Sequence, residues 1–223
     1  MEASYLSGAD VGSLLDPGGA AWRGARSERI ALMGTPVGLQ PTEAIRAKWI
    51  DKKIGAIGAV SVAALHDGTR LAFRLEWEDT SESREISDTT AFPDAAAVAL
   101  PSAEGSPIMT MGAVGAAVNA WYWRADEEGQ GRQVVAEGLG TSRGVEGKLV
   151  HAQGLWKEGR WSVVISRDLE IATDEPVAQL TPGQRTGFGV TVWEGSGGER
   201  AGIKAFSGDW IELVLQPLPT ARG

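Results

Sequence analysis

Few side chains in this sequence are of the types that bind metals or act as nucleophiles. The 223 residues include no Cys and only two His, His66 and His151. Without thiols the chain cannot form disulfides, iron–sulfur clusters, thiolate zinc sites or the C-x-x-C-H attachment of c-type haem. A zinc or non-haem iron site usually needs at least two His placed together with carboxylates. One His lies in a turn and the other in a polar stretch, so we expect no His-based metal site.

Glycines and carboxylates provide no clear catalytic motif either. The glycines of 138–144 miss the dinucleotide-binding spacing G-x-G-x-x-G by one residue and do not lie in a βαβ pattern. Asp67 with Asp79, or Asp94 with Glu104, could form the carboxylate pair of a glycoside hydrolase. Nothing in their neighbourhoods distinguishes them from solvated turn residues. The sequence therefore indicates no catalytic residue.

Charge and hydropathy argue against several classes of partner. The net charge of -8 disfavours nucleic acid and anionic lipid, because both require a basic face. The longest apolar stretch, around 55–65, is shorter than the roughly 20 residues that span a bilayer. The N-terminal residues 1–4 lack the charged and apolar regions of a signal peptide. We expect no nucleic-acid partner and no membrane span.

The hydrophobic pattern predicts strands joined by turns. Residues 70–78 alternate strictly, with Leu71, Phe73, Leu75 and Trp77 on one face, and they follow a β-prone run and an Asp-Gly turn. Apolar runs predict further strands at 92–100, 107–111, 117–124, 161–167, 187–193 and 210–216, with a weak one at 133–137. Helical periodicity is weak throughout and strongest at 42–51.

Many short strands with frequent turn signals indicate an all-β protein. We expect a two-sheet antiparallel β-sandwich, of the immunoglobulin-like or carbohydrate-binding-module-like kind, with few short helices. No internal repeat or low-complexity boundary divides the chain, so we expect one domain over 1–223. Its first 45 residues are rich in Gly and Pro, and we expect them to form a largely irregular arm.

An ordered series of motifs resembles one known family. The series begins with VSVAALHDG at 60–68 and LAFRLEWEDT at 71–80, and continues with FPDAAAVALP at 92–101, PIMTMG at 107–112, VNAWYWRAD at 118–126 and GERAGIKAFSGDW at 198–210. It is similar to the haem b-binding γ subunits of the ethylbenzene dehydrogenase and dimethylsulfide dehydrogenase group, whose complexes belong to the dimethyl sulfoxide reductase family of molybdenum enzymes. The resemblance covers roughly 10–215 and is thin over 127–160.

The resemblance implies one non-covalent haem b with a Met and a Lys as axial ligands of the iron. The Met that directly precedes Gly is Met111, and the Lys that precedes the Ser-x-x-Trp stretch is Lys204. Met109 is the competing thioether, because residues two apart on a strand share a face. We prefer Met111 because of the Met-Gly pattern. The family that the sequence resembles usually has a polar residue directly after Met-Gly, whereas this chain has Ala113.

The chemistry of the pair is feasible at neutral pH. A thioether is a neutral ligand that favours ferrous iron. A Lys must bind as the free amine although its ordinary pKa is about 10.4; burial disfavours the ammonium, and the iron competes with the proton. Lys204 lies in the small apolar run GIKAF at 202–206, whereas four of the six lysines have charged or polar neighbours.

The resemblance further implies an electron-transfer role without catalysis. The expected partners are an iron–sulfur β subunit and a molybdenum-containing α subunit, with a soluble cytochrome or similar protein as the external electron carrier. The expected location is the periplasm. Trp121, Trp123 and Trp193 are candidates to wall the haem, and Arg124, Arg167 and Arg200 are guesses for anchors of its propionates.

The alternative function is that of a non-catalytic carbohydrate-binding module. Sandwiches of this kind stack sugar rings on exposed Trp side chains, and the chain has nine Trp. Under that alternative Met111 and Lys204 are structural residues, and several Trp are exposed to solvent.

Overall fold

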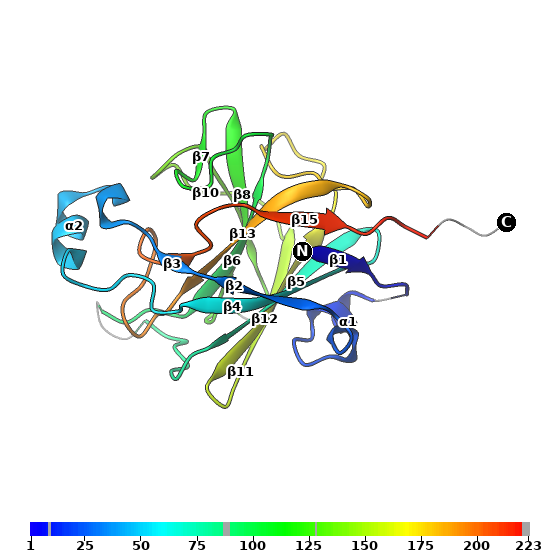
Figure 1. Cartoon of the computed structure of the whole chain (residues 1–223), viewed down its shortest axis with the longest axis horizontal. Coiled ribbons are helices and arrows are strands. Elements are labelled where there is room, and N and C mark those ends of the chain that lie inside the picture. Colours follow the sequence, from blue (N-terminus) through cyan, green and yellow to red (C-terminus); the bar gives the residue numbers. More distant parts are fainter. Residues whose placement is uncertain (9, 87–89, 128, 220–223) are drawn as a thin grey trace.

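A computed structural model describes residues 1–8, 10–86, 90–127 and 129–219, and strands dominate it (Figure 1). Among these residues the helical elements are two α-helices, α1 (Val11–Leu15) and α2 (Glu43–Trp49), and two 3-10 helices, η1 (Ala20–Trp22) and η2 (Val37–Leu39). The strands are β1 (Glu2–Tyr5), β2 (Ser27–Ala31), β3 (Met33–Gly34), β4 (Ala59–His66), β5 (Arg70–Glu78), β6 (Ala95–Pro101), β7 (Gly112–Ala113), β8 (Ala116–Arg124), β9 (Arg132–Ala136), β10 (Arg143–Gly144), β11 (Val150–Lys157), β12 (Arg160–Asp168), β13 (Arg185–Trp193), β14 (Ala205–Phe206) and β15 (Ile211–Leu215).

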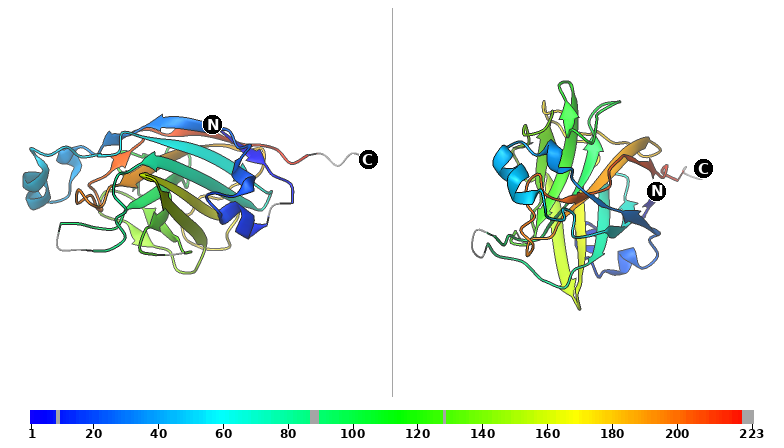
Figure 2. Two further views of the ribbon diagram at one scale, coloured as in Figure 1. Left: turned by 90° about the horizontal axis from the view of Figure 1, so that it is seen from below. Right: turned by 60° about the vertical axis from the view of Figure 1, so that its left-hand side comes forward.

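The main strands form two sheets, and β13 passes from one into the other (Figure 2). The first sheet runs β15-β1-β4-β5-β12-β11, and the second runs β10-β9-β8-β6-β13. The first half of β13, 185–188, pairs with β15, and its second half, 189–193, pairs with β6. The pairing is antiparallel except for β1, which runs parallel to both of its neighbours. The expected two-sheet β-sandwich with few short helices is confirmed.

Aromatic side chains fill the space between the sheets. The ring centroids of Trp123 in β8 and Trp161 in β12 are 4.9 Å apart, and those of Phe73 in β5 and Phe188 in β13 are 5.6 Å apart. All four side chains are at most 2% exposed. Because each buried aromatic ring removes about 150–250 Å² from water, these contacts account for a large part of the core.

The predicted hairpin is present as β4 and β5. Its register pairs Ser61 with Glu76 and His66 with Leu71, and the Asp-Gly turn lies between the strands. The alternating side chains of β5 face the core between the sheets, as the period of two requires. Ala72, on the opposite face, is also fully buried, because a further layer covers this sheet.

That layer comes from the N-terminal 45 residues, which differ from the irregular arm that we expected. Leu14 in α1 and Trp22 in η1 pack on Ala72 and its neighbours, while β1 inserts between β15 and β4. Trp22 Nε1–H also donates to the carbonyl of Leu14 at 3.0 Å. Apolar side chains widely spaced in a Gly-rich segment therefore tie it to the sheet.

The helical periodicity at 42–51 corresponds to α2. The helix is capped by Thr42, whose Oγ1 accepts a hydrogen bond from the Ile45 N–H at 3.3 Å. No helix in the described part of the chain is long and apolar enough to cross a membrane.

Two segments differ from the sequence-based expectation. Residues 107–111 form a turn and not a strand, because two backbone hydrogen bonds close the chain on itself at this point. The strand β11 was not predicted, because only its first half is well buried and its second half is largely exposed. It nevertheless pairs with β12 along its full length, from Val150 opposite Arg167 to Lys157 opposite Arg160.

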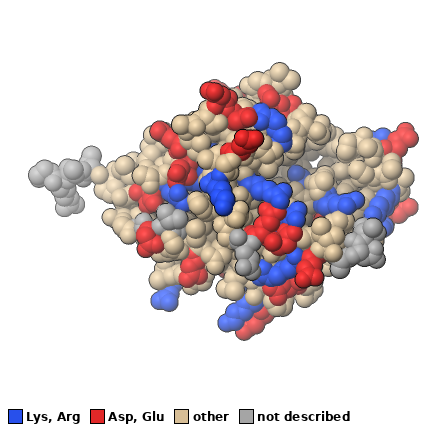
Figure 3. All heavy atoms as spheres, turned by 180° about the vertical axis from the view of Figure 1, so that it is seen from behind, with Lys and Arg blue, Asp and Glu red and all other residues tan. Residues whose placement is uncertain are grey.

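Charged side chains of both signs are intermixed over the face shown in Figure 3. Many acidic groups there lie next to Arg or Lys and not in a patch of their own. On this face the net charge of -8 therefore does not create a single-sign field that would steer a strongly charged partner.

Candidate functional site

The side chains of Met111 and Lys204 meet although they are 93 residues apart in the sequence. Lys204 Nζ lies 3.7 Å from Met111 Sδ. A thioether is a weak hydrogen-bond acceptor, so it satisfies an ammonium poorly. The fold has thus brought together two side chains that are poor hydrogen-bond partners for each other. Each can bind a metal, Met111 through its sulfur and Lys204 through its nitrogen.

A tight turn positions Met111. Its N–H donates to the Ile108 carbonyl at 3.0 Å, and the next N–H, that of Gly112, donates to the Pro107 carbonyl at 2.8 Å. Met111 has a φ of +57°, which is strained for a residue with a Cβ and is held here by the surrounding bonds. Its own carbonyl accepts from the Gly138 N–H at 3.0 Å.

The glycine of the Met-Gly pattern has a structural reason. Gly112 has a φ of +90°, and a Cβ at this position would lie 2.4 Å from the Ala136 carbonyl oxygen. Only glycine tolerates both the conformation and this approach. Gly112 therefore holds the turn against β9 and fixes where the Met111 side chain begins.

Lys204 directly precedes β14 and points into a dry environment. The residue is 9% exposed, and burial lowers the pKa of its amine to about 8. Among the residues that the structure describes, no carboxylate forms an ion pair with it. The Trp193 ring lies 5.1 Å from Nζ. The structure thus holds the amine where its proton is lost more easily than from an exposed lysine.

Both side chains line one cavity of about 440 Å³, which falls in the range of roughly 300–1,000 Å³ typical of ligand pockets. The cavity lies on the outer face of the second sheet, opposite the face that carries Trp121 and Trp123. Small side chains of β6 and β8, Ala97 and Ala120, leave room there. Its wall is mostly apolar and consists of Thr35, Pro36, Leu39, Gln40, Pro41, Ala97, Ile108, Met109, Met111, Ala120, Tyr122, Arg132, Val134, Leu139, Gly140, Ser142, Trp193, Ala201, Gly202, Lys204 and Phe206.

The turn separates the two methionines that the sequence left in competition. Met109 also lines the cavity, but it is 40% exposed, and it is Met111 whose sulfur contacts Lys204. Met109 and Met111 do not share a strand face, because 107–111 is a turn.

Of the other side chains that we considered at the haem, only Trp193 lines the cavity. Trp121 and Trp123 belong to the core between the sheets. Arg124 pairs with Asp126, while Arg167 is buried and bonds to polar groups of the core; neither lines the cavity, and nor does Arg200.

Sequence reasoning missed the charged side chain that does line the cavity, Arg132 on β9. It pairs with Glu127 near the cavity's edge. The alternation of side chains along β8 was the signal that could have identified this face of the sheet. Tyr122 lies on the opposite face from its two Trp neighbours, lines the cavity and pairs with Arg132 in the sheet.

Ser142 belongs to a G-x-S-x-G match at 140–144, which our sequence interpretation did not note. Such a motif is a nucleophile elbow only between a strand and a helix. Here the segment runs from the loop after β9 into β10, and neither His66 nor His151 lines the cavity with it. The match therefore gives no support to a hydrolase.

The residues present fit a haem iron. An amine with a lowered pKa and a thioether are in contact in a mostly apolar cavity. A thioether is a known haem-iron ligand, and an amine that has lost its proton can bind a metal. Lys204 Nζ and Met111 Sδ lie 3.7 Å apart, so these two side chains would hold an iron bound at this point of the cavity.

The tryptophans do not form a sugar-binding platform. All nine lie in the described part of the chain, and none of them is exposed. The two that are partly exposed, Trp156 and Trp210, use their indole N–H groups to donate to the carbonyls of Asp79 and Ser106. The feature that would mark a carbohydrate-binding module is therefore missing from these residues.

Comparison with known proteins places the chain among subunits of oxidoreductases. A family model described as ethylbenzene dehydrogenase matches residues 20–149 and 139–205. A protein of Haloferax mediterranei named as a respiratory nitrate reductase heme subunit is 30% identical over 204 residues, 91% of this chain and 69% of that protein. Chlorate reductase subunit gamma of Ideonella dechloratans is 29% identical over 93% of this chain and 81% of its own length. Dimethylsulfide dehydrogenase subunit gamma of Rhodovulum sulfidophilum is 27% identical over 66% of this chain and 57% of its own length.

Solved structures resemble the chain in fold alone. A family 9 carbohydrate-binding module of Caldicellulosiruptor kristjanssonii, solved with glucose, aligns with a TM-score of 0.53 over 100% of this chain and 98% of its own. A protein of Bacteroides uniformis described as carbohydrate-binding aligns with a TM-score of 0.51 over 97% and 98%. Both are 10% identical to this chain, so the likeness supports the β-sandwich and nothing about a ligand.

Proposed function

The chain belongs to the ethylbenzene dehydrogenase family, and we propose that it is the electron-transfer subunit of a molybdenum oxidoreductase complex, with one haem b held between Met111 and Lys204. Its relatives are named as a heme subunit and as gamma subunits of such enzymes. The chain is a haem-type subunit of an oxidoreductase complex and not its catalytic subunit. The haem type, the ligands and the partners are the further steps of the proposal.

The contact between Lys204 Nζ and Met111 Sδ at 3.7 Å inside the cavity carries the proposal. A buried Lys without a carboxylate is costly, and a structure gains nothing from pointing it at a thioether. Binding a metal through the free amine and the sulfur would offset the cost of burying this side chain. The family's axial pair and the geometry thus support the same two residues.

Each side chain has a separate role in this site. Burial keeps the Lys204 pKa near 8, so the amine gives up its proton readily and becomes a ligand at neutral pH. Met111 contributes a neutral, polarisable sulfur that favours the ferrous state and raises the reduction potential. Haem supplies a one-electron couple when it is bound.

Two protein ligands on one iron explain why we propose electron transfer and not catalysis. With both axial positions filled, no position stays open for a substrate or for oxygen. The apolar wall of the cavity, with Trp193 and Tyr122, excludes water and lowers the local dielectric, which tunes the potential. The protein's contribution is therefore ligand choice, dielectric and a docking surface.

The haem is of b type in this proposal because the chain has no Cys to attach it covalently. From the family resemblance, the proposed partners are an iron–sulfur β subunit and a molybdenum α subunit. Electrons pass between the iron–sulfur subunit and an external carrier such as a soluble cytochrome. The periplasm is the proposed location.

Absorption spectra of the full chain loaded with haem test the proposal. We expect a six-coordinate low-spin spectrum in the oxidised and the dithionite-reduced protein, and a high-spin spectrum in Met111→Ala and in Lys204→Ala. Met109→Ala is the matched control for the thioether, and Lys157→Ala, on an exposed hairpin, is the control for the amine. Both controls should retain the low-spin spectrum.

Two results would refute the proposal. One is a full chain that takes up no haem. The other is a low-spin spectrum that survives both ligand substitutions, because the iron would then be held by other residues. Loss of the spectrum in Met109→Ala alone would transfer the thioether role to that residue.

A further inference from the structure

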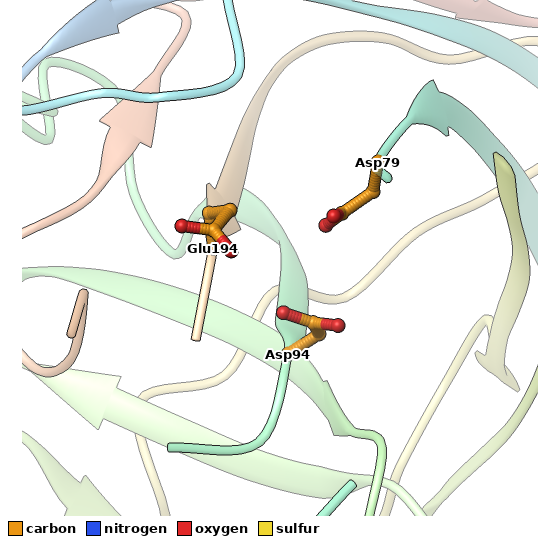
Figure 4. A group of neighbouring side chains, drawn as sticks. All are labelled: Asp79, Asp94 and Glu194. Atoms are coloured by element: carbon orange, nitrogen blue, oxygen red, sulfur yellow. The ribbon is translucent and has the colours of Figure 1, made fainter. Parts of the chain in front are cut away.

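Three carboxylates converge at the ends of strands (Figure 4). Asp79 directly follows β5, Asp94 directly precedes β6, and Glu194 directly follows β13. One oxygen from each lies within 4.8 Å of those of the other two. β5 belongs to the first sheet, whereas β6 and the second half of β13 belong to the second. The cluster therefore bridges the two sheets.

This cluster is buried and has no positive partner. Asp79 is 5% exposed and Asp94 is fully buried, and Glu194 is partly buried. Among the described residues, no Lys, Arg or His forms an ion pair with any of the three. Our interpretation of Asp79 and Asp94 as solvated turn residues is therefore wrong. Three acidic groups this close repel one another, and burial makes the repulsion stronger.

Hydrogen bonds fix the positions of the Asp94 and Glu194 carboxylates, and burial raises the pKa of Asp94 to about 6 although the bonds to it act in the opposite direction. Asp94 Oδ1 accepts from the Gly195 N–H at 2.8 Å, and its Oδ2 accepts from the Ser83 N–H at 2.9 Å and from Trp161 Nε1–H at 3.0 Å. Glu194 accepts from the backbone N–H groups of Ser196 and Gly197. These donors hold the two carboxylates in place beside a third.

Asp79 provides the independent sign that a ligand is missing. Its Oδ1 accepts from the N–H and the hydroxyl of Ser81, both at 3.0 Å. Its Oδ2 is buried and has no hydrogen-bond partner of normal geometry in the described part of the chain. The donor near this carboxylate is the Trp77 indole N–H, which also lacks such a partner. The carboxylate points toward Asp94 and Glu194 (Figure 4). A buried carboxylate oxygen without a partner is costly unless a cation or another donor satisfies it.

We propose that Asp79, Asp94 and Glu194 bind a calcium ion that joins the two sheets. The donor set consists of carboxylate oxygens, which suits hard cations and excludes soft metals. Calcium takes flexible sets of six to eight oxygen ligands, carboxylates and waters among them, whereas magnesium usually keeps several of its waters and is rarely held by protein ligands alone. A largely buried set of three carboxylates therefore favours calcium.

The ion would also fix the segment that carries Lys204. That segment begins at Glu194, and its next acidic residue, Glu199, returns to accept from the Glu194 N–H at 3.1 Å. Glu199 also accepts from the N–H groups of Gly55 and Ala56, at 2.7 and 2.9 Å. Calcium at the start of this segment therefore stabilises the loop structure up to Lys204, whether or not haem is bound.

Terbium luminescence and thermal unfolding of the full chain test the proposal. Terbium replaces calcium in oxygen sites, and the Trp161 indole, which bonds to Asp94, is close enough to sensitise its emission. We expect emission that calcium reverses and magnesium reverses poorly. After treatment with a chelator, added calcium should raise the unfolding temperature.

Asp79→Asn is the decisive variant, because it keeps the shape and the bonds to Ser81 but removes the charge. We expect its calcium affinity to fall at least about tenfold, since the number of charged ligands sets the affinity of such sites. In chelator it should unfold at or above the wild-type temperature, because one repelling charge is gone. Glu85→Gln removes an exposed carboxylate from the same loop and should bind calcium like the wild type.

The outcomes separate the proposal from a merely structural cluster. No calcium-dependent rise in the unfolding temperature of the wild type, together with no terbium emission, would overturn it. Unchanged calcium binding in Asp79→Asn would overturn it as well, because the ion would then lie elsewhere. If Asp79→Asn fails to fold, Glu194→Gln gives the same comparison from the partly exposed side of the cluster.

Discussion

Lys204 should give the haem-free chain a pH-dependent stability that an exposed lysine does not. Burial lowers the pKa of its amine from 10.5 to about 8 in the folded chain, while the unfolded chain restores the ordinary value. Each pKa unit corresponds to 1.36 kcal/mol, so the difference amounts to about 3 kcal/mol of free energy of unfolding.

The free energy of unfolding rises with pH because the folded chain releases the Lys204 proton at a lower pH than the unfolded chain. Below pH 8 the amine is protonated in both states, and the folded chain carries the full cost of a buried ammonium. As the pH rises from 8 to 10.5, the folded chain releases this proton before the unfolded chain does, and the cost disappears. The contribution of Lys204 to the free energy of unfolding should therefore rise by about 3 kcal/mol between pH 7 and pH 10.5.

Urea unfolding of the haem-free chain at these two pH values measures the effect. Lys204→Met retains the volume and removes the charge, so it should exceed the wild type by about 3 kcal/mol at pH 7 and nearly equal it at pH 10.5. Lys157→Met is the control, because this side chain is 73% exposed, and it should differ from the wild type by the same amount at both pH values. A Lys204→Met stability that parallels the wild type at both pH values would refute the reasoning.

Three further substitutions test the turn that carries Met111 and the packing between the sheets. Gly112→Ala adds a Cβ 2.4 Å from a backbone oxygen. Gly115 also has a positive φ, +75°, but open space surrounds it, so Gly115→Ala is the control. Gly112→Ala should lower the unfolding temperature more than Gly115→Ala and should also weaken the low-spin haem spectrum. Phe188→Ala removes a fully buried ring that stacks on Phe73 and should cost about 3–5 kcal/mol in urea unfolding. Arg167→Met leaves the carbonyls of Leu169 and Ala178 without their donor and should lower the free energy of unfolding by more than about 2 kcal/mol, with the haem spectrum unchanged.

The strands that alternate or are strongly apolar were predictable. The period of two along β5 and the apolar run of β12 follow directly from burial on one or both faces. β11 was missed because its exposed second half looks like a polar loop, and its position depends on pairing with β12. The turn at 107–111 was mistaken for a strand, since Pro, Ile and Met residues do not reveal that Met111 adopts a positive φ.

The candidate site could be predicted only through the resemblance. Met111 and Lys204 are separated by 93 residues, and no local pattern connects a turn after β6 with the residue before β14. The face of the second sheet that bears the cavity was also undetermined, because it depends on the covering segments around Leu39 and Leu139. The acidic cluster stayed hidden for a similar reason, since Asp79 and Asp94 look solvated until the sheets close over them.

Iron anomalous scattering from crystals of the haem-loaded full chain tests the central claim most directly. The account predicts one iron per chain, bonded to Met111 Sδ and Lys204 Nζ, inside the cavity on the outer face of β6, β8 and β9. An iron bonded to Met109, to either His, or to only one protein atom with an open sixth position would contradict it.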